Sequence, residues 1–303
     1  MARKVKPAPA CRSRRRWQSG FTLVEAVVVI VITSIIGTVV AVFLRAPVQG
    51  YVDSVARAEL SDTADLALRR ISRDLRLALP NSVRIDTNYM ELLLTSTGGR
   101  YLTEDDGVAG QILDFETTCV APATGAVPAG CKFDVVGPAP NSGNNPIAAG
   151  DSIVVHNLGF APADAYAGGN RAVVKGVSGQ TVTLESNVFA TQTPHKLRSP
   201  TNRFHVVTTP VTYVCNGTES GGNGTLVRYW GYPIQASQPV SAAALAGVPN
   251  AILATNVVQC SFNSVALRNT RTGLISIALT LEVANSNSGR ITLVHQVHVD
   301  NTP

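Results

Sequence analysis

The sequence predicts an α+β protein in which a long, membrane-spanning N-terminal helix packs on a β-rich globular head. Three observations support this fold class. Residues 20–44 are an apolar run long enough to cross a bilayer. Residues 45–80 then repeat apolar side chains at helical spacing, and residues 81–303 replace that period with short β-branched runs between Gly, Pro and Asn clusters.

The apolar run contains one charged side chain, Glu25. A carboxylate inside lipid costs about 2.5 kcal/mol or more, so its presence calls for a functional reason. A simple signal anchor with Glu25 near the interface is the plainer alternative. A secretory signal peptide fits less well, because the run is too long for an apolar core segment and no small-residue cleavage site ends it.

Basic residues are concentrated before the run. Residues 1–20 hold seven Lys and Arg and no acid, and removing these seven from the 25 basic residues leaves 18 against 20 acidic residues. A nucleic-acid-binding arm is one interpretation of such a segment. Its position directly before an apolar helix instead favours a cytoplasmic topology signal, and we expect no nucleic-acid partner.

Residues 45–80 have the pattern of an amphipathic helix. Pro47 is expected to kink this helix rather than to end it, and Pro80 ends the pattern. The predicted buried face consists of Leu60, Ala64, Leu68, Ile71, Leu75 and Leu79 or Ala78. The predicted charged face consists of Arg57, Glu59, Asp62, Asp65, Arg69, Arg70, Arg73, Asp74 and Arg76. Asp65 with Arg69, and Arg70 with Asp74, are four residues apart and can pair.

Residues 81–303 read as one β-rich head without an internal repeat or a clean second-domain boundary. Turns are expected at 178–180 and 285–289, and surface loops at 121–130, 137–150 and 216–224. The predicted strands are 89–95, 111–116, 132–136, 152–157, 171–177, 181–185, 203–208, 211–215, 225–230, 256–262, 274–283 and 291–299.

The string Gly20-Phe21-Thr22-Leu23-Val24-Glu25 resembles the processing motif of type IV pilins and type II secretion pseudopilins. The resemblance implies cleavage after Gly20 by prepilin peptidase, N-methylation of Phe21 and a role for Glu25 in assembly. It also implies a basic prepilin leader over 1–20, a transmembrane helix over 21–44, its amphipathic continuation over 45–80 and a periplasmic β-rich head over 81–303.

Two further stretches narrow the resemblance. Residues 65–84 resemble the J-type minor pseudopilins, and residues 225–234 with 257–262 resemble the J-like minor pilins of mannose-sensitive haemagglutinin (MSHA) pili. The segment 96–200 matches no motif. The resemblance implies a structural subunit, not an enzyme, that starts in the bacterial inner membrane and enters a pilus or pseudopilus. A J-type pseudopilin of type II secretion and a membrane-anchored, glycan-binding adhesin are the alternatives. The implied partners are other pilin subunits, prepilin peptidase, the inner-membrane assembly platform and membrane lipid.

Five cysteines are present, and one of them, Cys11, lies in the basic segment. The other four follow a membrane anchor, where an oxidising compartment favours disulfides. Proximity in sequence favours Cys119 with Cys131 and Cys215 with Cys260 among the three possible pairings. A zinc site is a weak alternative, because no Cys-x-x-Cys pair exists.

Motifs for catalysis, metal binding or cofactor binding are not evident, so none of these is predicted. His295 and His298 are three apart on a predicted strand and point to opposite faces. Residues 221–224 lack the Lys that follows a phosphate-binding loop, and residues 104–106 read as a solvated acidic loop. Tyr229, Trp230 and Tyr232 are a possible sugar-binding face, but packing within a sheet is the favoured interpretation.

Overall fold

The computed structural model describes residues 20–219, 223–266, 272–282 and 289–302. The chain divides into two compact units, Met1–Val52 and Asp53–Pro303, and each unit is described by itself. Helix α1 (Leu23–Arg76) begins in the first unit and ends in the second. Pro47 lies inside α1, which continues past it, in agreement with the apolar period that resumes after this proline.

The first unit contains the apolar part of α1. Its most apolar window has a mean hydropathy of 3.0 and is entirely exposed, and by length and composition the helix can cross a membrane. The hydroxyls of Thr33, Ser34 and Thr38 donate to main-chain carbonyls one turn earlier, at distances of 2.7–2.8 Å. These bonds satisfy the hydroxyls within the helix, which an apolar solvent requires.

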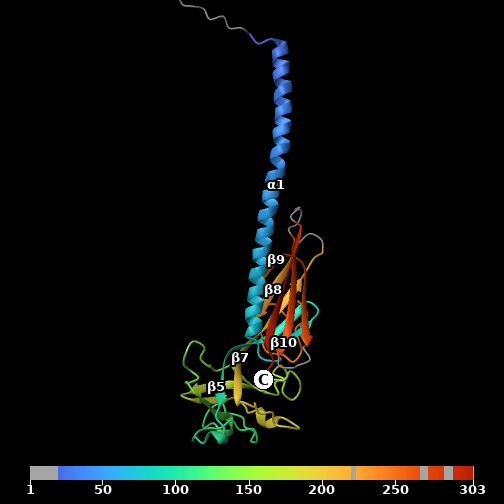
Figure 1. Cartoon of the computed structure of the whole chain (residues 1–303). Coiled ribbons are helices and arrows are strands. Elements are labelled where there is room, and N and C mark those ends of the chain that lie inside the picture. Colours follow the sequence, from blue (N-terminus) through green and yellow to red (C-terminus); the bar gives the residue numbers. More distant parts are fainter. Residues whose placement is uncertain (1–19, 220–222, 267–271, 283–288, 303) are drawn as a thin grey trace, which may run out of the picture. The chain divides into compact units, whose positions relative to one another are not determined.

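In the second unit, the predicted apolar face of α1 is buried in one core with strands of the sheet, which confirms the periodicity argument. Figure 1 shows the last part of the helix running alongside these strands. The helix ends earlier than residue 79, because the chain changes its hydrogen-bonding partners. The Leu79 N–H donates to the Leu93 carbonyl at 2.8 Å, and Ala78 forms an isolated bridge with Leu94. Residues 77–79 therefore join the sheet.

The strands of the described residues form one sheet in which all pairs are antiparallel. Its order is β1-β2-β3-β6-β5-β4-β7-β8-β9-β10-β11, with an additional β2–β7 pairing. The bounds are β1 (Arg84–Asp86), β2 (Tyr89–Tyr101), β3 (Lys132–Val136), β4 (Ser152–Val155), β5 (Arg171–Ser178), β6 (Thr181–Leu184), β7 (Arg203–Asn216), β8 (Gly224–Trp230), β9 (Asn250–Ala266), β10 (Thr272–Glu282) and β11 (Arg290–Asp300).

Strand β7 belongs to both halves of this sheet. Its first half pairs with β4 and its second half with β8, while β2 runs along nearly its full length on the other side. The prediction of two separate strands, 203–208 and 211–215, is therefore wrong. Pro210 is tolerated because it lies between Val207, where β4 pairing ends, and Val211, where β8 pairing begins.

The predicted strand over 111–116 is also wrong. Leu113 and Phe115 are buried, as the alternation required, but the segment forms no strand. Asp114 prevents it, because its carboxylate accepts the N–H groups of Glu116 and Thr117 at 2.7 and 3.0 Å and turns the chain. The predicted hairpin over 178–180 joins β5 to β6, whereas the turn at 285–289 lies, apart from Gly289, outside the described residues.

Two principal hydrophobic cores share the β2–β7 pair. The first lies between α1 and the strand group β2, β7, β8, β9, β10 and β11. The second is built by β3, β4, β5 and β6 with the far ends of β2 and β7, and it holds an aromatic cluster of Tyr101, Phe115, Phe133, Phe189 and Phe204. The segment 96–200, which matched no motif, supplies most of the second core.

Asp74 is buried, so its placement on the charged face is wrong. Only 2% of Asp74 is exposed, and its Oδ2 accepts from Arg228 Nε and from the Tyr213 hydroxyl, both at 2.7 Å. Asp74 stands next to Leu75 and three residues after Ile71, at the margin of the apolar face, and Arg228 neutralises its charge. Burial, together with the adjacent carboxylate, raises the pKa of Tyr213.

A second buried carboxylate, Glu91 on β2, is fully enclosed. It contacts Arg84 Nε at 2.6 Å and accepts from the Tyr232 hydroxyl at 2.8 Å. Burial raises the pKa of Glu91 despite these partners. Asp74 thus ties α1 to β7 and β8, and Glu91 ties β2 to β1 and to the segment after β8.

Asp74→Ala is expected to lower the free energy of unfolding by about 3–5 kcal/mol, because Arg228 stays buried without its carboxylate. Asp65→Ala is the matched control on the same helix, since it removes an exposed pair with Arg69 and should cost less than about 1 kcal/mol. Urea denaturation of the purified chain in detergent measures both. Equal losses in the two variants would contradict a structural role for the buried pair.

Candidate functional site

The segment around the predicted cleavage position is exposed and precedes the helix. Gly20 has no atom within 4 Å of the position that a Cβ would occupy, and Phe21 is 78% exposed. Helix α1 begins only at Leu23. The Gly20–Phe21 bond therefore lies in non-helical chain, where a peptidase can bind the backbone in an extended form.

Thr22 caps α1. The Glu25 N–H donates to Thr22 Oγ1 at 3.3 Å, and the Ala26 N–H donates to the Thr22 carbonyl at 3.1 Å. This satisfies donors that the first turn leaves unpaired. This role of Thr22 was not predicted, although Thr22 and Glu25 have the Thr-x-x-Glu spacing of a capping box, which indicates the start of a helix.

Glu25 lies in the first turn, where the positive end of the helix dipole favours a carboxylate. Its side chain is exposed and accepts no hydrogen bond or ion pair within the part of the chain that the structure describes. The carboxylate is thus positioned at the start of an apolar helix and remains available for a partner charge.

The four later cysteines form two disulfides, in the pairs that sequence proximity favours. Cys119 pairs with Cys131, which directly precedes β3, with a Cα–Cα distance of 5.6 Å. Cys215 on β7 pairs with Cys260 on β9 in the first core, with a Cα–Cα distance of 6.2 Å. Cys11 lies outside the described residues.

The residues weighed for other chemistry are not assembled into a site. Among the described residues there is no group of three His, Cys, Asp or Glu side chains that could hold a metal ion. Residues 104–106 form a short 3-10 helix rather than an open loop, and Asp106 pairs with Arg100 at 2.5 Å. Hydrogen bonds from Thr103 and Arg100 lower the pKa of Asp106.

The aromatic residues at the end of β8 pack rather than form an open platform. Tyr232 is 8% exposed, and its hydroxyl is bonded to Glu91 and Thr212. Trp230 is partly buried against the first core, and the Arg228 guanidinium lies 5.1 Å from the centre of its ring. These contacts support the packing interpretation over a sugar-binding face.

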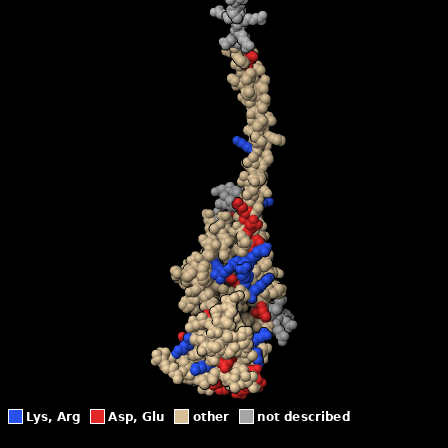
Figure 2. Space-filling model, turned by 90° about the vertical axis from the view of Figure 1, so that its left-hand side faces the viewer, with Lys and Arg blue, Asp and Glu red and all other residues tan. Residues whose placement is uncertain are grey.

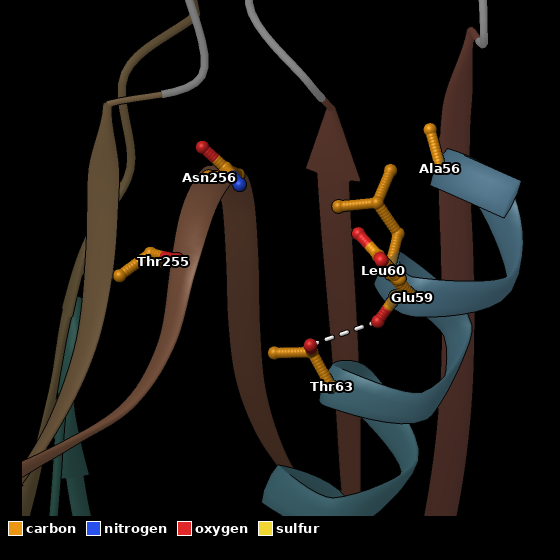
Figure 3. A pocket seen from close by; sticks show the side chains of 6 residues that line it. All are labelled: Ala56, Glu59, Leu60, Thr63, Thr255 and Asn256. Atoms are coloured by element: carbon orange, nitrogen blue, oxygen red, sulfur yellow. Dashed lines mark hydrogen bonds between the residues drawn. The ribbon is translucent and has the colours of Figure 1, made fainter. Parts of the chain in front are cut away.

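A shallow cavity of about 240 Å³ opens between α1 and a bulge of β9 (Figure 3). Its lining residues are Ala56, Glu59, Leu60, Thr63, Thr255 and Asn256. The Thr63 hydroxyl donates to the main-chain carbonyl of Glu59 at 2.8 Å, so it is already engaged. With a single carboxylate and no nucleophile–base pair, the cavity has no evident catalytic chemistry.

A family model described as the prokaryotic N-terminal methylation motif matches residues 18–41. The motif indicates a type IV pilin-like or pseudopilin precursor. Proteins with this motif generally assemble with other pilins and are processed by prepilin peptidase. Together with the apolar helix, the match indicates a single-pass, membrane-anchored protein. No match to the chain was found among curated proteins or among solved structures.

The two disulfides should differ in their contribution to stability. Cys215–Cys260 closes a sequence separation of 45 and Cys119–Cys131 one of 12. In the chain-entropy model these loops correspond to about 4 and about 3 kcal/mol. We expect Cys215→Ala with Cys260→Ala to unfold at lower urea concentration than Cys119→Ala with Cys131→Ala. The reverse order would show that loop length does not govern the difference.

Proposed function

We propose that this chain is a minor pilin-like structural subunit of an MSHA-type type IV pilus, similar to the biogenesis protein MshO, and that it acts in pilus biogenesis or initiation. The observation that carries the proposal is the methylation motif at the start of an exposed apolar helix. The protein is made in the inner membrane, cleaved after Gly20 and N-methylated at Phe21. Its head is periplasmic before it enters the filament through the assembly platform.

Glu25, which has no partner among the described residues, supports an assembly role. As a membrane anchor alone, the chain would be more stable in lipid with an apolar residue at this position. A filament subunit has a use for the charge, because cleavage creates an amine at Phe21 that can pair with Glu25 of the same or a neighbouring subunit. In a low-dielectric environment such a pair attracts strongly, and although desolvation offsets much of the gain, it specifies the register of packing.

The alternatives make different predictions. A J-type pseudopilin of a type II secretion system would have secretion-channel genes beside it instead of pilus-biogenesis genes. An anchored adhesin would bind glycans through its head, which a glycan array tests on the full chain in detergent. The buried Tyr232 and the partly buried Trp230 argue against the aromatic cluster as that binding face.

Gly20→Val is expected to block processing, because a branched side chain replaces the small residue at the scissile bond. Mass spectrometry of the chain from a host with active prepilin peptidase should show N-methylated Phe21 in the wild type and an intact leader in the variant. Gly37→Val, at an exposed position within α1, is the matched control and should be processed normally. An intact leader in the wild type would overturn the proposed function.

Glu25→Leu is expected to leave membrane insertion intact and to reduce incorporation into filaments, because the partner charge is lost while the apolar helix remains. Cross-linking to neighbouring pilins and counts of surface filaments measure this in the native host. Glu59→Leu, a loss of the same charge in the second unit, tests whether any acid on α1 has the same effect. Normal filaments in the Glu25→Leu strain would reject the register role and favour the anchored-adhesin alternative.

A further inference from the structure

Strand β11 is the last strand of the sheet, and no described residue pairs with its outer edge. Its eleven residues pair with β10 in one uninterrupted register, from Thr272–Asp300 to Glu282–Arg290. The N–H and C=O groups that an edge strand turns away from its neighbour form a template for another strand. The opposite edge of the sheet is much less suited to this, because β1 has only three residues.

β11 lacks the features that usually keep an edge strand from pairing with another chain. It contains no Lys or Pro, and its pairing with β10 has no bulge. Figure 2 shows acidic and basic side chains gathered along the last part of α1, whereas β11 has one of each, Arg290 at its start and Asp300 at its end. The register of any strand that pairs with this edge is therefore set by these two charges and by the apolar pattern between them.

The two faces of β11 differ in burial. The face toward the first core carries the buried or half-buried residues Ile291, Leu293, His295, Val297 and Val299. The opposite face is exposed and carries Arg290, Thr292, Val294, Gln296, His298 and Asp300. A partner strand has to continue both faces, with apolar side chains beside the first set and polar side chains beside the second.

A second copy of β11 meets this requirement when the two strands run antiparallel about a two-fold axis at His295. Arg290 of each copy then faces Asp300 of the other, so opposite charges meet at both ends of the pairing. A shift by two residues keeps the faces matched, but it separates these charges and shortens the pairing. A shift by one residue would place the apolar face of one copy beside the exposed face of the other.

The inner face also matches itself in this register. Ile291 faces Val299 and Leu293 faces Val297, which continues the apolar side of the sheet across the contact. His295 is the polar residue in the middle of this apolar row, and it makes no hydrogen bond through its side chain to another described residue. On the axis it faces His295 of the second copy. Two neutral imidazoles can share a hydrogen bond, because each has one N–H donor and one acceptor nitrogen.

The direction of β11 decides which copies can meet in this way. A Cβ at Gly289 would lie 3.4 Å from Arg57 Nη2, and Asn81 Nδ2 donates to the Asn301 carbonyl at 3.2 Å. β11 therefore begins beside the earlier part of α1 in the second unit and ends beside the residues that follow the helix. In an antiparallel pair, the segments that lead to the two membrane anchors leave the contact at opposite ends.

We propose that two copies of this chain, held in different membranes or filaments, adhere to each other through their β11 edges, antiparallel about a two-fold axis at His295. The contact is isologous, because both copies use the same strand, and it closes at two copies. One strand pairing is a small interface, so we expect a reversible contact that is strengthened where several copies meet. The inference goes beyond the proposed function, because it concerns contacts between anchored or assembled subunits and not their assembly.

Cysteine cross-linking tests the register. Two differently tagged full-length copies, both with Cys11→Ser, are reconstituted in separate vesicles, mixed and oxidised mildly. Thr292→Cys in one copy with His298→Cys in the other should yield a disulfide-linked dimer, because residues that face each other on antiparallel strands lie within disulfide range. Each variant mixed with itself is a matched control, since its two cysteines would lie about 20 Å apart. We expect at least about a tenfold excess over both controls, the factor produced by a preference of about 1.4 kcal/mol.

Charge reversal tests the end pairs. When both copies carry Asp300→Arg, arginines face each other at both ends, and co-sedimentation of the two vesicle populations should be lost. One of these copies is then replaced by a chain with Glu282→Arg and Arg290→Glu, which keeps the Arg290–Glu282 pair in swapped form. This mixture restores opposite charges at both ends and should restore co-sedimentation. Such rescue by the other chain cannot arise from a defect in the folding of either copy.

The remaining outcomes test the orientation and the occupant. Cross-links between two copies within one vesicle, in place of cross-links between vesicles, overturn the opposed orientation. Equal cross-linking in all three cysteine combinations overturns the register, and loss of co-sedimentation without rescue overturns the charge pairing. In the native host, a cross-link from His298→Cys to a different protein in place of a second copy overturns self-recognition. None of these measurements depends on cleavage after Gly20, so failure of this inference and failure of the proposed function are distinguishable.

Discussion

The packing of the last part of α1 against the sheet is the constraint on which the second unit depends. The buried side of the helix shares one hydrophobic core with residues from β2, β7, β8, β9, β10 and β11, strands far apart in sequence. Burial of apolar side chains supplies the main driving force of this contact. The Asp74–Arg228 pair makes this packing specific, since the buried carboxylate of Asp74 is stable only with the Arg228 guanidinium beside it. The helix is thereby fixed both along and around its axis, which also decides which side chains are left facing outward.

Much of the architecture follows from patterns that can be read locally. The apolar face from Leu60 to Leu75 was predicted from helical spacing and is buried as expected. Most β-branched runs form strands near their predicted positions. The cysteine pairs follow from proximity once the fifth cysteine is assigned to the basic segment. These features depend on neighbouring residues, and periodicity or spacing is sufficient to find them.

Two of the wrong predictions share a physical cause, because contacts between residues distant in the sequence decide them. The sequence places Asp74 on the charged face because its partner Arg228 lies on the distant strand β8. It divides residues 203–215 into two strands because the pairing of β7 with both β4 and β8 exists only in the folded sheet. Asp114 replaced a strand by a turn through bonds of its own side chain. At the candidate site the motif itself is evident in the sequence. The cap at Thr22 follows from the capacity of its hydroxyl to accept a hydrogen bond, which the family resemblance does not indicate.

The continuity of β2 and β7 through both cores has a mechanical consequence. These strands are hydrogen-bonded to each other from Tyr89–Val214 at one end to Arg100–Arg203 at the other. A pull on the second core along these strands loads the ladder in shear, so many hydrogen bonds must fail together rather than one after another. The load passes directly into the first core, where Cys215 of β7 is tied covalently to β9. The β2–β7 pair therefore carries tension from one core to the other, and the shift in pairing register between Leu94 and Thr97 is where this ladder is least regular.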